Sequence, residues 1–291
     1  MTRLEFLTAA TERLHASGVE DARRNAEWIV EDVTGASRAG LYASPNAQVG
    51  DEERERMEGM VLRRASGEPI QYVLGHADFM TLRLRVAPGV LIPRPETEEV
   101  LEAALSAIRE CADPWVLDIG TGSGALALGV ASERSDATVF AADVSPEALE
   151  IASANADELG LDVSFVHADA LRPQFADRVP PAFDLILSNP PYVPLAERPS
   201  LQREVREHEP GLALFVPDHD PLVFYRAVAG HASGLLRPGG WLVVETHADH
   251  GRAVVELFQA SGLTETALQQ DLSGRDRIAR GRMPLASGAR G

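Results

Sequence analysis

Four consecutive residues in the second half of the chain, Asn189-Pro190-Pro191-Tyr192, combine groups that could hold a planar amino group. Two successive prolines fix their φ angles and lack N–H donors, so nearby carbonyl oxygens are left without local partners. The Asn189 side-chain oxygen and the Pro190 carbonyl would then accept hydrogen bonds from the two N–H groups of an –NH2 group. This favours a pyramidal nitrogen that attacks an electrophilic methyl carbon, with Tyr192 packed against the flat acceptor. Such catalysis depends on positioning and electrostatics rather than on a strong base. The structural alternative is an ordinary turn at the end of a strand.

A glycine-rich segment lies upstream of this tetrapeptide, between an expected strand and an expected helix. Glycines permit a tight turn and leave no Cβ to block a ligand. An acid precedes the glycines, and a second acid, Asp143, ends the next strand, where ribose hydroxyls are held. NAD enzymes and enzymes that use S-adenosylmethionine share this pattern, and a tight turn without a ligand is the structural alternative. S-adenosylmethionine lacks phosphate and carries positive groups that suit Asp118, so we predict this cofactor. The predicted cofactor-binding residues are Asp118, Gly120, Thr121, Gly122, Ser123, Gly124 and Asp143.

These motifs require elements that place them at one edge of a sheet. Short apolar runs predict strands over 115–118, 138–143, 163–166, 183–188 and 241–245, and helices are expected over about 125–133 and 221–236. Ser145 and Pro146 are an N-cap and a first helical residue for another helix. Alternating strands and helices predict an α/β fold with a parallel sheet, whose ligands bind beyond the carboxyl ends of its strands. Asp169, after the third strand, is either a partner for the adenine amine or a solvated loop residue.

The first part of the chain has a different pattern. Apolar residues recur at helical spacing through residues 1–66, whereas residues 72–74 and 79–86 suggest two strands around a turn. A proline-rich stretch follows and cannot form a helix interior. We therefore predict a helical recognition domain over 1–70, a β-hairpin linker over 71–88 and a catalytic domain over 89–291.

Composition limits the classes of function. The 27 basic residues, all arginine, against 44 acidic residues give a net charge of −17, which disfavours stable nucleic-acid binding. The absence of lysine fits either a salt-rich cytoplasm or a biased genome. One cysteine excludes an internal disulfide, and no signal peptide or membrane span is visible in the sequence, so we expect a cytoplasmic protein. We also expect a monomer. No histidine spacing indicates a metal site.

Several segments together resemble the release-factor glutamine methyltransferases, the PrmC or HemK family. The resemblance lies in the glycine-rich segment and the Asn189–Tyr192 tetrapeptide together with four further segments. These are Arg64–Gly75, Leu91–Glu98, His208-Glu209-Pro210 and Asp271–Arg277, in the family's order along most of residues 60–282.

The resemblance implies a Rossmann-like, seven-stranded methyltransferase sheet and a helical domain that holds the release factor. It also implies methyl transfer from S-adenosylmethionine to the side-chain amide of the glutamine in the factor's Gly-Gly-Gln loop. Asn189 would then touch cofactor and substrate, and Pro190, Pro191 and Tyr192 would hold the glutamine. Arg94 and Glu96 would lie near the substrate entrance, for which the start of a helix is the competing explanation. The family often has a bulky residue against the adenine where this chain has Ala170, which we keep as a cofactor contact.

Two other functions stay open at this point. The first is a methyltransferase that acts on an exocyclic amine of a DNA or RNA base, because that amine is also a planar –NH2 group. The second is a nucleotide-binding module that performs no chemistry.

Overall fold

The computed structural model describes residues 1–286, which form two compact units. The helical unit comprises Met1–His76 and Gln202–His208, and the sheet unit comprises Ala77–Leu201 together with the chain from Glu209 onward. The sequence prediction divided the chain after residues 70 and 88 and assigned residues 202–208 to the larger domain. The chain thus leaves the sheet unit for a short segment, Gln202–His208, and then returns to it.

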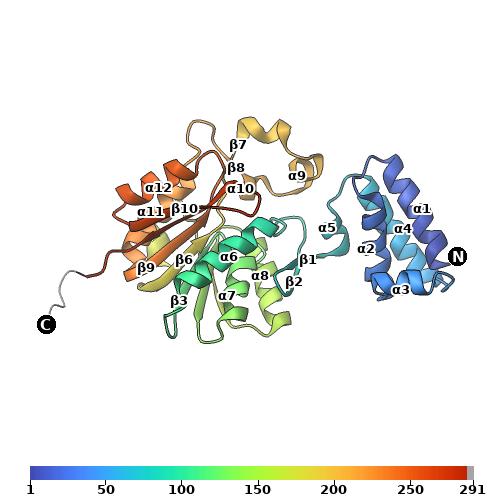
Figure 1. Cartoon of the computed structure of the whole chain (residues 1–291), viewed down its shortest axis with the longest axis horizontal. Helices are drawn as coiled ribbons and strands as arrows, with labels where there is room; N and C mark the ends of the chain where they lie inside the picture. The colour runs from blue at the N-terminus through green and yellow to red at the C-terminus, as the bar shows by residue number, and fades with distance from the viewer. Residues whose placement is uncertain (287–291) are drawn as a thin grey trace. The chain divides into compact units, whose positions relative to one another are not determined.

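The helical unit surrounds a core of its own, in which Leu14, Ile29 and Met57 are fully buried. Its first helix begins with a capping box, because the Thr2 hydroxyl accepts from the Glu5 amide and the Glu5 carboxylate accepts from the Thr2 amide. The helices, blue to teal in Figure 1 except for the last, are α1 (Arg3–Ala16), α2 (Ala22–Thr34), α3 (Arg38–Ala43), α4 (Asp51–Ala65), α5 (Ile70–Leu74) and α9 (Arg203–His208).

The strand expected over residues 72–74 is wrong, because these residues belong to helix α5. Pro69 precedes this helix, and Gly75, at a φ of +83°, ends it with its amide donating to the Gln71 carbonyl. A three-residue apolar run carries no periodicity that could distinguish helix from strand. The predicted hairpin follows instead from β1 (His76–Phe79) and β2 (Leu82–Arg85).

The sheet unit contains a seven-stranded sheet, as expected, but the sheet is mixed rather than wholly parallel. The strands lie in the order β10-β11-β9-β6-β3-β4-β5, with β11 antiparallel to both of its neighbours and the other pairs parallel. From β3 the chain moves outward to β4 and β5 and then returns to the other side of β3 with β6. This reversal between β3 and β6 marks the point where such sheets bind ligands. The strands are β3 (Trp115–Ile119), β4 (Thr138–Asp143), β5 (Val163–His167), β6 (Phe183–Ser188), β9 (Leu236–Glu245), β10 (Thr264–Gln270) and β11 (Asp276–Arg282).

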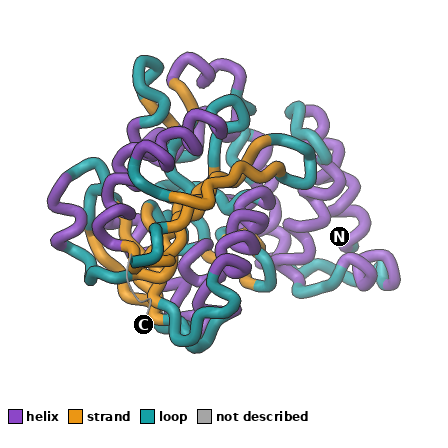
Figure 2. The backbone as a smooth tube through the Cα atoms, turned by 60° about the vertical axis from the view of Figure 1, so that its left-hand side comes forward, coloured by secondary structure: helices purple, strands orange, loops and turns teal. Residues whose placement is uncertain are grey.

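Helices cover both faces of this sheet (Figures 1 and 2). Successive strand residues face opposite sides, so Val116 packs with α6 and α7 in one core, whereas Leu117 packs with α11 and α12 in the other. The helices of this unit are α6 (Pro95–Ala107), α7 (Ala125–Glu133), α8 (Pro146–Leu159), α10 (Gly211–Leu214), α11 (Val223–Leu235) and α12 (Gly251–Ala260), with 3₁₀ turns η1 (Pro173–Asp177) and η2 (Leu195–Ser200) and the small strands β7 (Val193–Pro194) and β8 (Phe215–Val216).

Most predicted elements of this unit are confirmed, including the Ser145 cap and Pro146 at the first position of α8. The last parallel strand is longer than expected. Arg237-Pro238-Gly239-Gly240, which lie between the expected helix and the expected strand, belong to β9. The Gly239 amide donates to the Met283 carbonyl and the Met283 amide to the Gly240 carbonyl, so these residues extend the pairing with the end of the chain.

Candidate active site

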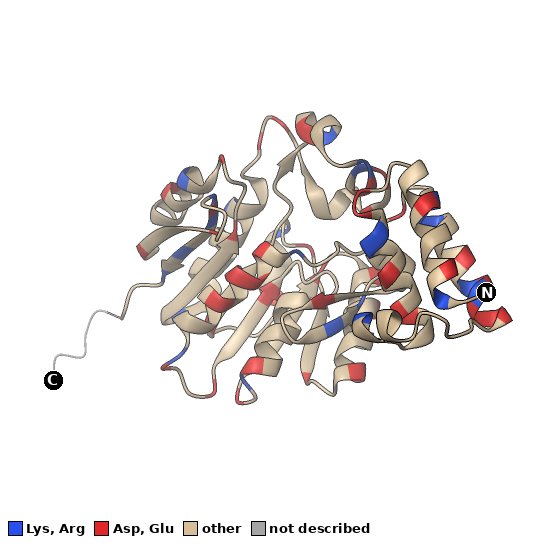
Figure 3. Cartoon of the chain, turned by 45° about the vertical axis from the view of Figure 1, so that its right-hand side comes forward, with Lys and Arg blue, Asp and Glu red and all other residues tan. Residues whose placement is uncertain are grey.

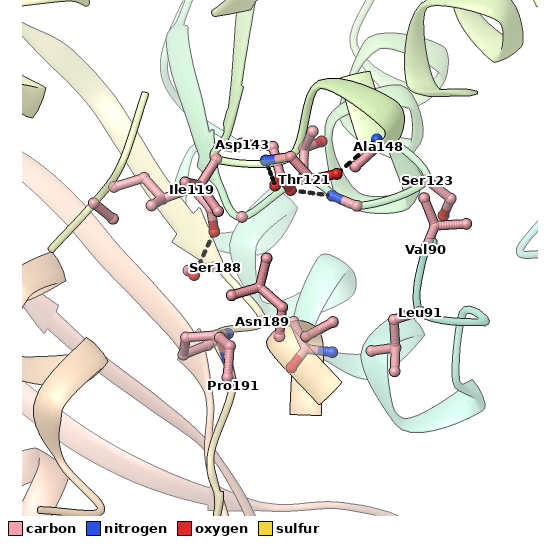
Figure 4. Close-up of a pocket in the computed structure, with 18 of the residues that line it drawn as sticks. Val90, Leu91, Ile119, Thr121, Ser123, Asp143, Ala148, Ser188, Asn189 and Pro191 are labelled. Atoms are coloured by element: carbon pink, nitrogen blue, oxygen red, sulfur yellow. Dashed lines mark hydrogen bonds between the residues drawn. The ribbon is translucent and has the colours of Figure 1, made fainter. Parts of the chain in front are cut away.

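A cavity of about 320 Å³ opens at the carboxyl ends of β3, β4, β5 and β6. Figure 4 shows Thr121 and Asp143 on one side, Ser188, Asn189 and Pro191 on a second, and Val90 and Leu91 on a third. Residues from both predicted motifs, which are far apart in the sequence, therefore face one space. A volume of this size suits a small organic ligand.

The glycine-rich loop lines this cavity in a conformation that depends on its glycines. Gly120, Gly122 and Gly124 have φ angles of +78°, +56° and +88°, a region that other residues rarely adopt. A Cβ on Gly124 would lie 2.9 Å from Leu128 Cδ1 and 3.2 Å from Ala152 Cβ, which is too close for both. The loop can therefore approach a ligand with its backbone, and Gly124 also lets α7 and α8 pack closely.

Asp118, predicted to bind cofactor, lies beneath the loop and is not among the residues that line the cavity. Its carboxylate is fully buried, and its Oδ2 accepts from the Thr121 hydroxyl at 2.7 Å and from the Ala127 amide at 3.2 Å. Burial raises the pKa of this carboxyl to about 7, although these two donors oppose the shift. The other oxygen, Oδ1, has no hydrogen-bond partner among the described residues. The residue anchors the loop and leaves one acceptor unpaired.

Asp143, at the end of β4, lines the cavity with its carboxylate fixed by backbone amides. Its Oδ2 accepts from Gly122 N–H and its Oδ1 from Ser145 N–H, each at 2.9 Å. Asp169 and Ala170, which follow β5, also line the cavity. Asp169 accepts from the Leu171 amide at 2.9 Å, and the Ala170 carbonyl accepts from the His231 ring at 2.8 Å. Each carboxylate oxygen keeps a lone pair for a further donor.

Asn155 on α8 is a supporting residue that the sequence did not indicate. Its Nδ2 donates to the Ser123 carbonyl at 2.9 Å and to the Arg85 carbonyl at 3.1 Å, while its Oδ1 accepts from the Arg85 amide at 2.7 Å. The side chain is 1% exposed, so these backbone groups would be unsatisfied without it. Asn155 thus joins the glycine loop to β2.

Asn189, Pro190 and Pro191 line the cavity directly after β6. The Asn189 Nδ2 donates to the Thr97 hydroxyl at 3.1 Å. Tyr192 is not among the lining residues, and its hydroxyl donates to Glu245 Oε1 at 2.9 Å. Burial, with Glu245 beside it, raises the pKa of Tyr192 well above its usual value, so the hydroxyl keeps its proton.

The segment that begins with Leu91 contributes an apolar wall and a salt bridge. Val90, Leu91 and Pro93 line the cavity, as does Leu212 of α10. Arg94 does not line it, and its guanidinium pairs with the buried carboxylate of Glu209, which also accepts from the Ile92 amide. Arg94 is the N-cap residue and Pro95 the first residue of α6, so the helix-start explanation of this segment is confirmed. Glu96 follows in the first turn and does not line the cavity either.

Charge is distributed widely in the structure. Figure 3 shows Asp and Glu residues on helices and loops of both units. Within residues 1–286, no group of three or more His, Cys, Asp or Glu is arranged to hold a metal ion. No helix in that range is long and apolar enough to cross a bilayer.

Comparisons with known proteins agree with the fold. A family model described as a methyltransferase domain matches residues 116–208, and one described as the PrmC N-terminal domain matches residues 5–75. A crystal structure of a methyltransferase from Pyrococcus furiosus has the same fold. Its TM-score is 0.50 and its identity 17%, and the match covers 71% of this chain and 91% of that one. The chain is an S-adenosylmethionine-dependent methyltransferase with a Rossmann-like sheet.

Full-length relatives specify the family. The release factor glutamine methyltransferase of Geobacter sulfurreducens is 40% identical over 270 residues, 93% of each chain. That of Cereibacter sphaeroides is 40% identical over 291 residues, covering 98% of this chain and all of the relative. The chain belongs to the release factor glutamine methyltransferase family. The family, fold class, methyl donor and enzyme class that the sequence predicted are confirmed.

Proposed function

We propose that this protein methylates the side-chain amide nitrogen of the glutamine in the Gly-Gly-Gln loop of peptide chain release factors. The observation that carries the proposal is the placement of Asn189 and the glycine loop in the wall of one cavity. A methyl donor held by the loop would lie beside an acceptor held by Asn189. Relatives named for this activity support the choice of a protein glutamine over a nucleic-acid base.

The cavity fits S-adenosylmethionine in three respects. Gly120 and Gly122 have room for a ligand against their backbone, since a Cβ on either would meet no atom within 4 Å. Asp143 would accept from ribose hydroxyls, and Asp169 and Ala170 would lie beside an adenine ring, since all three line the cavity. The Asp118 Oδ1 under the loop has no hydrogen-bond partner among the described residues, which leaves an acceptor for a donor group of the cofactor. The cofactor, when bound, supplies an electrophilic methyl carbon on a sulfonium that becomes a neutral thioether.

The acceptor site depends on Asn189 and Pro190. An amide nitrogen is a weak nucleophile because its lone pair is delocalised into the carbonyl. Asn189 Oδ1 and the Pro190 carbonyl would accept hydrogen bonds from its two N–H groups. These bonds would favour a pyramidal nitrogen whose lone pair points toward the methyl carbon. The N–C bond forms as the C–S bond breaks, and the nitrogen then loses one proton to water. These fixed dipoles act in a largely apolar cavity, where they are stronger than in water.

Three further assignments from the sequence belong to this proposal. The Tyr192 ring packs against the substrate amide while its hydroxyl is held by Glu245. Arg94 and Glu96 contribute to substrate binding near the entrance, Arg94 by holding the 90–94 segment on Glu209. The helical domain recognises the release factor, which places the protein in the cytoplasm, where translation ends.

Transfer of labelled methyl groups tests the proposal. The protein is incubated with labelled S-adenosylmethionine and, separately, with a release factor, the same factor with its loop glutamine replaced by alanine, RNA and DNA. We expect label only on the release factor that keeps its loop glutamine. Label on nucleic acid but not on the factor would reject the proposal.

A pair of variants tests the role of Asn189. Asn189→Ala should lower the methylation rate by about 100-fold or more, as the loss of one oriented dipole does in other enzymes. Gln174→Ala, at an exposed position of the sheet unit that does not line the cavity, is the control and should methylate normally. Equal rates for the two variants would remove Asn189 from the mechanism.

A further inference from the structure

A buried chain of hydrogen bonds lies behind Asn189. The Thr97 hydroxyl accepts from Asn189 Nδ2 at 3.1 Å and donates to Glu245 Oε2 at 2.6 Å. The Tyr192 hydroxyl donates to the other oxygen of Glu245 at 2.9 Å. Thr97 is 3% exposed and Glu245 is 1% exposed, so water does not compete for these bonds.

The members of this chain come from three separate elements. Thr97 is in the first turn of α6, Glu245 is the last residue of β9, and Tyr192 follows β6 by four residues. Thr97 lines the cavity together with Asn189, whereas Glu245 lies behind it. None of the three belongs to the glycine loop, so the chain supports the acceptor side of the site.

The direction of each bond follows from the proton inventory of the groups. An ionised carboxylate only accepts, so the single Thr97 proton must point to Glu245. The Thr97 oxygen can then only accept from Asn189. The side chain of Asn189 must therefore turn its –NH2 group to Thr97 and direct Oδ1 away from it. The two ends of an asparagine amide have nearly the same shape, so packing alone would not select this orientation.

We propose that Thr97 and Glu245 are positioning residues that fix the amide orientation of Asn189, so that its oxygen meets the –NH2 group of the substrate glutamine. This inference rests on the proposed function. In the reversed orientation two –NH2 groups would face each other, and the acceptor on which the reaction depends would be lost.

The charge on Glu245 sets which group donates and which accepts in each of these hydrogen bonds. Burial raises the pKa of Glu245, and nearby Glu96 of α6 adds to the shift, whereas the hydroxyls of Thr97 and Tyr192 and the Arg277 guanidinium of β11 oppose it. A protonated Glu245 could donate to Thr97, and Thr97 could then donate to the oxygen of Asn189. Methylation should therefore decline below the raised pKa of Glu245, at a higher pH than an ordinary glutamate would set.

Variants of Thr97 separate orientation from structure. Thr97→Val keeps the shape of the side chain but removes the hydroxyl. It should lower kcat for the release factor about ten-fold or more. KM should not change, because contacts with the release factor away from the reacting glutamine set KM. Thr97→Ser restores a hydroxyl and should recover most of the lost rate. Calorimetry with S-adenosylhomocysteine should give similar affinities for both variants. A Thr97→Val enzyme with normal kcat, or a Thr97→Ser enzyme as slow as it, would overturn the proposal.

A variant of Glu245 and a direct measurement complete the test. Glu245→Gln introduces a donor that cannot ionise, so it should be slow at every pH and lose the acid decline. Exchange of the Asn189 side-chain amide protons, followed by NMR, should be slower in the wild type than in Thr97→Val. If wild-type protein fails to methylate release factors, the proposed function fails. The exchange rates of the Asn189 amide protons then test by themselves whether Thr97 and Glu245 orient this amide. Equal exchange in wild type and Thr97→Val would reject that role.

Discussion

Replacing Asp118 by asparagine should change how the stability of the sheet unit depends on pH. Burial raises the pKa of this carboxyl from 3.8 to about 7, so between these values the folded protein holds a proton that the unfolded chain has released. Stability then falls as pH rises through this window, by about 1.4 kcal/mol for each unit. Between pH 5 and pH 7 the wild type should lose about 2 kcal/mol through this group alone, because the slope flattens as the pH approaches the folded pKa.

The asparagine side chain cannot ionise, so the Asp118→Asn protein lacks this pH-dependent loss. Its amide oxygen can still accept from Thr121 and Ala127, while its –NH2 group replaces an oxygen that has no partner among the described residues. Any cost of that unpaired donor is the same at every pH. The free-energy difference between variant and wild type should therefore shift in favour of the variant by about 2 kcal/mol from pH 5 to pH 7.

Urea unfolding followed by tryptophan fluorescence measures this difference. Trp28 is in the helical unit, and the other two tryptophans, Trp115 and Trp241, are in the sheet unit. A Trp28→Phe background therefore makes the signal report on the sheet unit. Asp162→Asn, at an exposed position, controls for the loss of one charge. A difference in the free energy of unfolding between Asp118→Asn and wild type that is constant with pH would refute the argument that burial raises the pKa of Asp118.

Two further predictions concern the loop and the tyrosine. Gly124→Ala should destabilise the sheet unit by about 2 kcal/mol or more in urea unfolding, because alanine disfavours the positive φ and its Cβ meets Leu128. Gly230→Ala, in a helix with open space around it, should instead stabilise by up to about 1 kcal/mol, and equal effects would contradict the geometry. Tyr192→Phe keeps the ring but removes a donor that lowers the pKa of Glu245. Its methylation rate should be near normal at high pH, and the acid decline should move to higher pH; an unmoved profile would contradict the link.

The location of the site could be predicted from the sequence because parallel strands end at a common edge. The glycine loop, Asp143, Asp169 and Asn189 each follow a strand that an apolar run marks clearly. Where runs were short or mixed, the prediction failed, as with α5. The Arg237–Gly240 segment was misjudged for a related reason. Its proline and glycines indicate a turn locally, and only the distant residues near Met283 pair with them as a strand.

The supporting residues could not be predicted, since their partners are distant in sequence. Thr97 and Glu245 are 148 positions apart, and Asn155 is 70 positions from Arg85. A lone threonine in a helix or a lone glutamate after a strand carries no pattern that would connect them. The same limit applied to Arg94, whose pairing with Glu209 depends on how the segment after residue 208 folds back.

Three polar residues that line the cavity, Asp143, Asp169 and Asn189, share one property, which is that each is held by a backbone amide or a buried side chain. Asp143 is fixed through both oxygens, Asp169 through a neighbouring amide, and Asn189 through its nitrogen. Each therefore offers a remaining lone pair in a set direction, so little side-chain entropy is lost when a ligand binds. The same arrangement explains why a weak nucleophile can be used. Under the proposed mechanism, dipoles that are already oriented would need no reorganisation during methyl transfer, and Thr97 and Glu245 would keep one of these dipoles oriented without touching the substrate.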